Sequence, residues 1–334
     1  MIHIAADLHL RPCIWKGHPE INGDQFKAWA TLCKTVANDK EGALILAGDI
    51  FDTPNPSGTT EYAFKRGMEL LAKAGRPCWF IPGNHDNEEI PRPYLFGARL
   101  LDERIKWGNL TIAGVPFTRS TEALHSAIES LPPTDLLILH TGFRHLLGFN
   151  ETWQISAEDI PDSIKKVFAG HVHVHSEEGK VYSPGSLALH RADEIDKGHG
   201  FFSVADDGTV KWTEVFTRQF VPVDVHEGFS LDSLVPLAES SGGTAVVLLN
   251  YQNTLASVAD AIQEYYKGRL LFVCNARAAE RAQVVEDTDT ASFDPKAVAT
   301  AYLSEHLNNE ERSLAESIMT AEDPSKAIEE YLCQ

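Results

Sequence analysis

Five short apolar segments each end in acidic, amide or imidazole side chains, and this regularity constrains the fold more than any other feature. The segments are IHIAAD (2–7), ALILAGD (43–49), CWFIPGN (78–84), DLLILHT (135–141) and KVFAGHV (166–172). Short apolar runs bounded by polar clusters are typical of strands that are buried on both faces. Because ligands gather outside the carboxyl ends of strands in open α/β sheets, we expect the polar clusters to meet at one place.

Amphipathic segments separate the first three of these strands. Apolar residues recur with helical spacing over 26–36 and again over 63–72. The alternation of buried strands with amphipathic helices predicts a layered α/β fold. Farther along, GFFSVADDGTVKWTEVF (200–216) alternates around an Asp-Gly pair, which predicts a hairpin.

The chain divides into four predicted regions. Residues 1–219 form the layered α/β domain, and from Phe220 three strand-like segments with helical segments between them predict a small α+β capping domain over 220–276. Residues 277–292 are interpreted as a linker. Residues 293–334 show helical spacing after an Asp-Pro start, which predicts a helical segment.

The formal net charge of −19 bears on the class of partner. A domain that binds nucleic acid on its own usually has a basic surface. Either the substrate is not a polyanion, or metal ions and a basic partner supply the positive field. The alternative is that the acidity only keeps the protein in solution.

The compartment is predicted from the cysteines and from the apolar segments. The five cysteines are scattered and form no C-x-x-C pair, which favours a reducing compartment and argues against a zinc knuckle. No apolar segment approaches the ~18 residues of a membrane span. A strand-like segment begins at Ile2, so no signal peptide is expected, and we predict a cytoplasmic protein.

The stretch VFAGHVHVHSEE (167–178) places histidines at 171, 173 and 175. The alternation fits one face of a strand, and it fits two metal ligands beside a bystander. Imidazole, carboxylate and amide oxygen together suit manganese, iron or zinc. A carboxylate shared by two ions ~3.5–4 Å apart suits phosphoryl transfer. The other polar residues at strand ends are Asp7, His9, Asp49, Asp52, Asn84, His85, Asp86 and His140.

The motifs D-x-H, GD-x-x-D, GNHD, a lone His and GH-x-H, in this order, resemble the signature of the calcineurin-like metallophosphoesterases. The resemblance implies a metallophosphoesterase β-sandwich flanked by helices, with two divalent metal ions. Mn²⁺ is expected, with Mg²⁺, Fe²⁺ or Zn²⁺ as alternatives. It further implies that Asp7, His9, Asp49 and His173 hold the first ion, and that Asp49, Asn84, His140 and His171 hold the second. His85 is left as the catalytic residue that protonates the leaving oxygen, and Asp52 orients a ligand.

Two longer segments resemble the SbcD-type DNA repair nucleases of the bacterial or phage branch. They are GDIFDTPNPSGTTEYAFKR (48–66) and VYSPGSLALHRADEIDKGHGFFSV (181–204). The resemblance implies a 3′-to-5′ exonuclease and single-strand endonuclease that processes DNA ends, in the host cytoplasm if a phage encodes it. It also implies that 293–334 binds an SMC-like coiled-coil ATPase, SbcC in bacteria, and it leaves a homodimer open. The chain has no GxxxxGK[ST] loop, so ATP hydrolysis would fall to that partner.

Two alternatives stay open on the sequence. A stand-alone phosphodiesterase for a small substrate, such as a cyclic nucleotide, would use the same metal site but has little need of a capping domain. A scaffold with a degenerate site would be expected to have lost some of the ligands, whereas this set is complete. The remaining histidines of interest are interpreted as non-ligands, and they are His3, His145, His175, His190 and His199.

Overall fold

The computed structural model describes residues 1–13, 15, 18–86, 92–144, 146 and 155–277. The predicted helical segment 293–334 and the predicted linker, apart from Arg277, lie outside these residues. Met1–Ala279 forms one compact unit. Within the described part of the chain, no helix has the length and apolar character needed to cross a bilayer.

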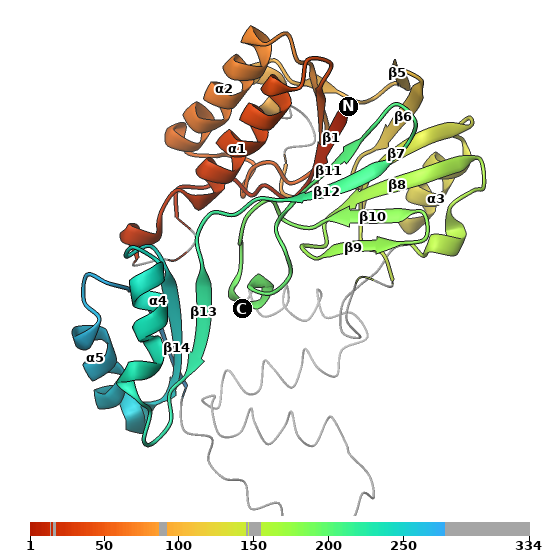
Figure 1. Ribbon diagram of the computed structural model, residues 1–334. Coiled ribbons are helices and arrows are strands. Elements are labelled where there is room, and N and C mark those ends of the chain that lie inside the picture. The colour runs from red at the N-terminus through yellow and green to blue at the C-terminus, as the bar shows by residue number, and fades with distance from the viewer. Residues whose placement is uncertain (14, 16–17, 87–91, 145, 147–154, 278–334) are drawn as a thin grey trace, which may run out of the picture. The chain divides into compact units, whose positions relative to one another are not determined.

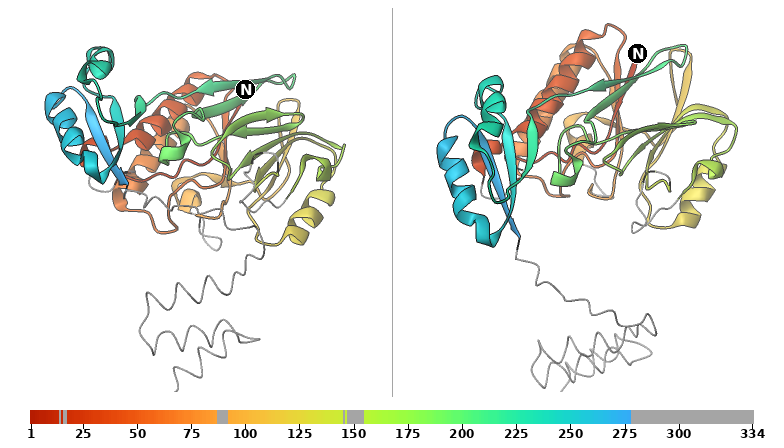
Figure 2. Two further views of the ribbon diagram at one scale, coloured as in Figure 1. Left: turned by 90° about the horizontal axis from the view of Figure 1, so that it is seen from below. Right: turned by 60° about the horizontal axis from the view of Figure 1, so that its bottom comes forward.

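Two six-stranded sheets face each other as layers (Figures 1 and 2). The first has the order β12-β11-β1-β2-β3-β4 and the second β5-β6-β7-β8-β10-β9. The first sheet contains β1 Ile2–Ala5, β2 Ala43–Ala47, β3 Cys78–Ile81, β4 Arg99–Leu100, β11 Gly200–Val204 and β12 Val210–Glu214. The second contains β5 Ile105–Trp107, β6 Leu110–Val115, β7 Thr134–His140, β8 Ile164–Gly170, β9 His175–Glu178 and β10 Val181–Pro184. The layered α/β prediction is therefore confirmed, and the five predicted strands are β1, β2, β3, β7 and β8.

Strand β2 shows why the central strands are apolar on both faces. Leu44 and Leu46 pack into the cluster that the helices cover, whereas Ala43 and Ile45 face the opposite sheet. Successive side chains of a strand point to opposite faces, so a strand between two layers needs apolar residues at every position. The core between the sheets also contains Phe168 from β8, which is fully buried.

Helices close the outer face of each sheet. Helix α1 (Asp24–Asn38) and helix α2 (Gly58–Lys73) lie side by side against the first sheet, and α3 (Thr121–Glu129) lies against the second (Figure 1). Helix α2 begins where the Ser57 hydroxyl accepts a hydrogen bond from the Thr60 amide at 3.3 Å, an N-cap of the usual kind. Both helices that the apolar spacing predicted are present, whereas α3 was not predicted.

Residues 220–277 form a small module in which three strands alternate with helices. Its sheet has the order β13-β14-β15, and all its strands are parallel. The elements are β13 Phe220–Asp224, α4 Val235–Ser240, β14 Val246–Gln252, α5 Ala256–Tyr265 and β15 Leu271–Arg277. It has an apolar cluster of its own, which includes Tyr266 and Ile262. The boundaries placed at 219 and 276 stay predictions.

Candidate metal centre

The loops that follow the strands carry unusual backbone conformations. Positive φ values occur at Asp7 (49°), His9 (38°), Asp49 (49°) and His171 (98°), which are the non-glycine residues with this feature in the described ranges. A conformation of this kind costs ~1–3 kcal/mol and persists where the surroundings hold it, commonly at functional sites. The strain therefore falls on four of the residues that the sequence singled out.

The loops after β1 and β2 are held side by side by backbone hydrogen bonds. The Asp7 amide donates to the Gly48 carbonyl at 3.2 Å, and the His9 amide donates to the Asp49 carbonyl at 3.0 Å. Gly48 has a φ of +86°, and a Cβ there would lie 2.1 Å from Nδ1 of His140. The absence of a side chain thus lets β2 turn and lets the His140 ring pack against it.

One half of the site joins the ends of four strands. Asn84 Oδ1 lies 3.1 Å from His140 Nε2 and 2.9 Å from His171 Nδ1. Asp49 Oδ2 lies 3.3 Å from the same Nε2 of His140. Asp49, His140 and His171 form a group whose ligand atoms lie within 4.8 Å of one another. We refer to these four residues as the Asn84 half-site.

The other half shares Asp49. His9 Nε2 lies 3.6 Å from Asp49 Oδ2 and 3.0 Å from His173 Nε2. His173 Nε2 lies 3.9 Å from Asp7 Oδ1. Both carboxylate oxygens of Asp7 also accept from the His171 amide, at 3.0 Å each. We refer to Asp7, His9, Asp49 and His173 as the His173 half-site. The structure thus brings all seven predicted ligands together, with Asp49 Oδ2 between the two halves.

The chemistry of these donor atoms fits cations. The Nδ1 atom of His140 lies 2.8 Å from the Ala47 carbonyl, which can only accept, so this nitrogen carries a proton. In the neutral ring Nε2 then presents a lone pair toward Asn84 Oδ1 and Asp49 Oδ2, which are also electron-pair donors. Electron pairs that converge in this way suit a divalent ion with nitrogen and oxygen ligands. The residues therefore fit two such ions.

The pKa values of the residues in the Asn84 half-site are shifted because ionisable groups lie close together there. Burial would lower the pKa of His140, but the Asp49 carboxylate outweighs it and raises that pKa to about 9. Burial would raise the pKa of Asp49, but the His140 and His9 rings hold it well below its usual range. Burial lowers the pKa of His171 to about 4, together with the charge of His140. A proton on His140 occupies a place that a metal ion could take.

His85 lies at the mouth of the site. It lines a cavity of about 730 Å³ together with His9, Asp49 and Asn84. Its Nδ1 lies 2.9 Å from the Asp52 carbonyl. That carbonyl can only accept, so Nδ1 carries a proton and Nε2 remains for other contacts. His85 also forms a ligand group with His9 and Asp49 within 4.8 Å, so the geometry by itself does not separate ligand from proton donor.

Asp52 supports the site from the side. Its carboxylate lies 3.6 Å from His9 Nδ1 and accepts from the Arg11 guanidinium at 3.0 Å. The contact with His9 is longer than a hydrogen bond, so Asp52 acts on this ring through its charge, and its own position is held by Arg11. Asp86 is buried and accepts from the Gly83 amide at 2.9 Å, and burial raises the pKa of Asp86 to about 6. It therefore braces the turn that carries Asn84.

Sequence reasoning missed Glu194, and it named His190 only as a non-ligand. Glu194 binds His173 Nδ1 at 2.6 Å, and His190 stacks on His9 with ring centroids 4.1 Å apart. His9, His173 and His190 also form a ligand group. A signal that could have pointed to Glu194 is the spacing H-x-x-x-E at 190–194, which begins four residues after Ser186 of the Gly-Ser step.

The other described histidines of interest have partners outside the two half-sites. His175 stacks on Trp212 with ring centroids 4.0 Å apart. His3 lies 2.9 Å from the Ser203 hydroxyl, and His199 lies 3.0 Å from the Ser186 hydroxyl. His145 lies outside the described residues.

Two clusters of imidazole, carboxylate and amide oxygen that share one aspartate, at the strand ends of a layered α/β fold, define a dinuclear metallohydrolase centre. Residues 1–200 match the family model for calcineurin-like phosphoesterases, and the chain belongs to this family of metal-dependent phosphoesterases.

Three proteins illustrate the similarity. The chain is 25% identical over 231 residues to the DNA double-strand break repair protein Mre11 of Sulfurisphaera tokodaii, across 62% of this chain and 58% of that protein. It is 26% identical over 231 residues to the Mre11 of Sulfolobus acidocaldarius, across 61% of this chain and 60% of that protein. It is 40% identical over 85 residues to the SbcD component of the nuclease SbcCD of Bacillus subtilis, across 25% of this chain and 21% of that protein. The chain therefore spans less than two thirds of these relatives.

Proposed function

We propose that the chain is a two-metal-dependent DNA nuclease, with 3′-to-5′ exonuclease and single-strand endonuclease activity, and the nuclease subunit of an SbcCD-type complex in DNA end processing, recombination or repair. The observation that carries the proposal is the convergence of seven ligand atoms on two adjacent half-sites that share Asp49 Oδ2. The names of the similar proteins, Mre11 and the nuclease SbcCD, favour DNA as the substrate.

The residues at the site have distinct parts in this proposal. A bound pair of divalent ions supplies positive charge to the attacking and leaving oxygens of an in-line displacement at phosphorus. The His173 and Asn84 half-sites would hold them, with Asp49 bridging. His85 is positioned by the Asp52 carbonyl through Nδ1, so a protonated Nε2 can donate to the leaving oxygen.

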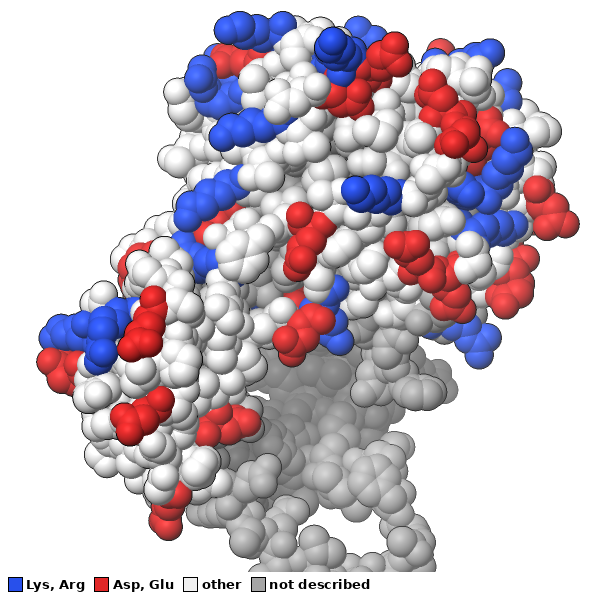
Figure 3. All heavy atoms as spheres, viewed as in Figure 1, with Lys and Arg blue, Asp and Glu red and all other residues white. Residues whose placement is uncertain are grey.

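Charge explains why the ions matter for a polyanionic substrate. The protein has a net charge of −19, and acidic and basic side chains are interspersed on the face shown in Figure 3. Two divalent ions add local positive charge where the scissile phosphate must lie. Arg191 and Lys197 also line the cavity and could contact flanking phosphates. Mn²⁺ is the proposed ion because of the resemblance to the SbcD-type nucleases, and Mg²⁺, Fe²⁺ and Zn²⁺ are the alternatives that this mixture of oxygen and imidazole ligands also admits.

We also propose that residues 293–334 bind an SMC-like, SbcC-type coiled-coil ATPase. The proposal leaves a homodimer of the chain open. Co-purification of the full chain with such an ATPase would support the first, and a dimeric mass in solution would support the second.

The decisive test uses the full chain, stripped with chelator and reloaded with Mn²⁺. Substrates would be end-labelled single- and double-stranded oligonucleotides, bis(p-nitrophenyl) phosphate and a cyclic nucleotide. We expect Mn²⁺-dependent cleavage of the oligonucleotides. Cleavage of the cyclic nucleotide without any cleavage of DNA would instead favour a small-substrate phosphodiesterase.

The role of His85 is tested in the same assay. His85→Asn removes the proton donor and should lower DNA cleavage by ~10²–10⁴-fold while both ions stay bound. His226→Asn is the matched control, because His226 is exposed and its ring contacts nearby parts of the chain, the Glu227 carbonyl and the Phe229 ring, far along the sequence from the site residues. Unchanged cleavage by His85→Asn would remove this residue from the mechanism, and loss of an ion would make it a ligand.

A further inference from the structure

Glu194 is a buried carboxylate that uses both oxygens beside the metal centre. It is 4% exposed. Its Oε1 accepts from His173 Nδ1 at 2.6 Å. Its Oε2 accepts from the His190 amide at 2.9 Å and from the Ser186 hydroxyl at 3.1 Å. The Glu194 side chain therefore links the predicted ligand His173 to the backbone at His190.

The contact with His173 decides which nitrogen of that ring faces the centre. Glu194 binds Nδ1, so Nε2 is directed to His9 Nε2, 3.0 Å away. Without this acceptor the ring could turn or could carry its proton on Nε2, and either change removes the lone pair from the His173 half-site.

The contact with the His190 amide holds a second ring in place. The His190 ring stacks on His9 at a centroid distance of 4.1 Å and an interplanar angle of 18°. Its Nδ1 lies 3.3 Å from Arg11 Nη2, and a guanidinium can only donate, so Nδ1 accepts that hydrogen bond. His190 is thus committed to Arg11 and to packing on His9 rather than to ligation through Nδ1.

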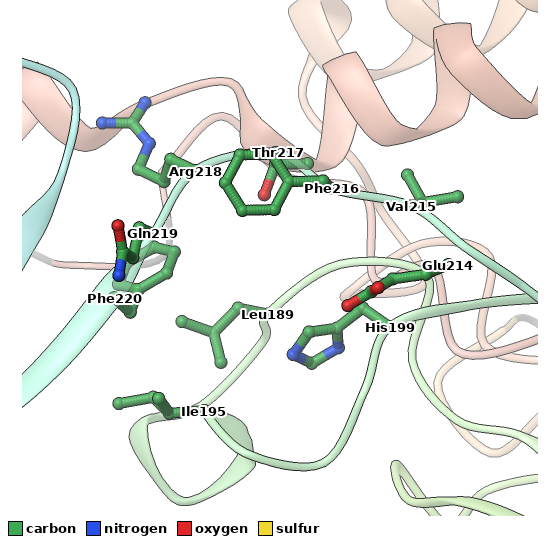
Figure 4. A pocket seen from close by; sticks show the side chains of 10 residues that line it. All are labelled: Leu189, Ile195, His199, Glu214, Val215, Phe216, Thr217, Arg218, Gln219 and Phe220. Atoms are coloured by element: carbon green, nitrogen blue, oxygen red, sulfur yellow. The ribbon is translucent and has the colours of Figure 1, made fainter. Parts of the chain in front are cut away.

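A chain of hydrogen bonds supports Glu194 from behind. The Ser186 hydroxyl donates to Glu194, so it accepts from Nδ1 of His199 at 3.0 Å. His199 Nε2 is buried without a hydrogen-bond partner. Figure 4 shows the His199 ring among the side chains that line a cavity of about 160 Å³. Ser186 is fully buried, so the support is shielded from water.

We infer that Glu194 is a positioning residue of the His173 half-site, acting through His173, and that Ser186 and His199 hold it in place. The inference rests on the proposed function only in requiring that the half-site binds a divalent ion. It assigns Glu194 no contact with substrate. The Asn84 half-site has its own support, the Ala47 carbonyl behind His140, and should not depend on Glu194.

The test is a titration of the chelator-stripped full chain with Mn²⁺, in which electron paramagnetic resonance counts bound ions and gives an affinity for each. Glu194→Gln preserves the volume and removes the charge. It should weaken one ion by ~10–100-fold and leave the other unchanged. Asp193→Asn is the matched control, because this neighbour is 69% exposed and should bind both ions like wild type.

Further variants separate positioning from folding and from ligation. Ser186→Ala leaves the Glu194 carboxylate in place and should weaken the same ion by a smaller factor, which tests the inference even if Glu194→Gln fails to fold. His190→Phe keeps a ring on His9 and should retain both ions. Loss of an ion from His190→Phe would make His190 a ligand and overturn the assignment.

The remaining outcomes are distinct. If Glu194→Gln binds both ions with wild-type affinity, or weakens both equally, the inference is overturned and the proposed function still stands. A wild-type protein that binds no Mn²⁺ would overturn the proposed function, and the inference with it.

Discussion

Gly48 offers a test of how closely the backbone must approach His140. Gly48→Ala adds one methyl group, which has two separable costs. The φ of +86° penalises an L-residue by about 1–2 kcal/mol. The new Cβ would also lie 2.1 Å from His140 Nδ1, so the ring must move away from the Ala47 carbonyl, which it now meets at 2.8 Å.

The displaced ring sets the size of the effect. Loss of one buried hydrogen bond costs about 1–3 kcal/mol. Together with the backbone cost of about 1–2 kcal/mol, this lowers the free energy of unfolding by about 2–5 kcal/mol. Because His140 Nε2 belongs to the Asn84 half-site, we also expect the affinity of one Mn²⁺ ion to fall by at least ~10-fold.

Gly179→Ala is the matched control for the backbone term. Gly179 has a φ of +58°, and nothing lies within 4 Å of its added Cβ. It should cost about 1 kcal/mol and leave Mn²⁺ binding unchanged. The assays are urea denaturation of the metal-free proteins and Mn²⁺ titration. Equal losses of stability in the two variants, with both ions bound normally by Gly48→Ala, would refute the reasoning.

Three further predictions concern the bridge, the core and pH. Asp49→Asn should weaken both ions, since Oδ2 lies between the half-sites, and retention of either ion at wild-type affinity in a Mn²⁺ titration would contradict the bridging role. Phe168→Ala should cost about 3–5 kcal/mol because the ring is fully buried between the sheets, whereas Phe216→Ala, at 74% exposed, should change the unfolding free energy little. The hydrogen bond from Lys165, together with those from Thr111, lowers the pKa of Asp135 to about 2. A lowered folded-state pKa stabilises the protein above the unfolded pKa of about 3.9 and loses that effect as the pH falls toward 2. Asp135→Asn should therefore cost about 1 kcal/mol in urea denaturation at pH 7 and less at pH 3, and a difference that does not depend on pH would contradict this.

Local patterns in the sequence were enough to predict the layers. Strands such as β2 are apolar at every position because both faces are covered, and α1 and α2 show helical spacing because each buries one face. The motifs also predicted which side chains meet, because parallel strands carry their carboxyl ends to the same edge.

Elements with weaker patterns were missed. Strand β5 is a short outer strand of the second sheet, and its residues are exposed or half-buried, so no continuous apolar segment marks it. Helix α3 buries only Leu124 and Ile128, too few to stand out as a period. The strand β9 begins at His175, whose ring packs on Trp212, a contact that depends on the distant hairpin β11-β12.

The sequence by itself determined that the fold is layered α/β and that polar side chains gather at the carboxyl ends of its apolar strands, because both follow from side-chain chemistry and short-range periodicity. Only the tertiary structure decided how each ligand is oriented. The Ala47 carbonyl selects the free nitrogen of His140, and Glu194 selects that of His173. Ala47 lies 93 residues from His140, and Glu194 lies 21 residues from His173, so neither pairing can be recognised within one short segment. The tautomer of each ring in the fold is set by the neighbour that binds its Nδ1.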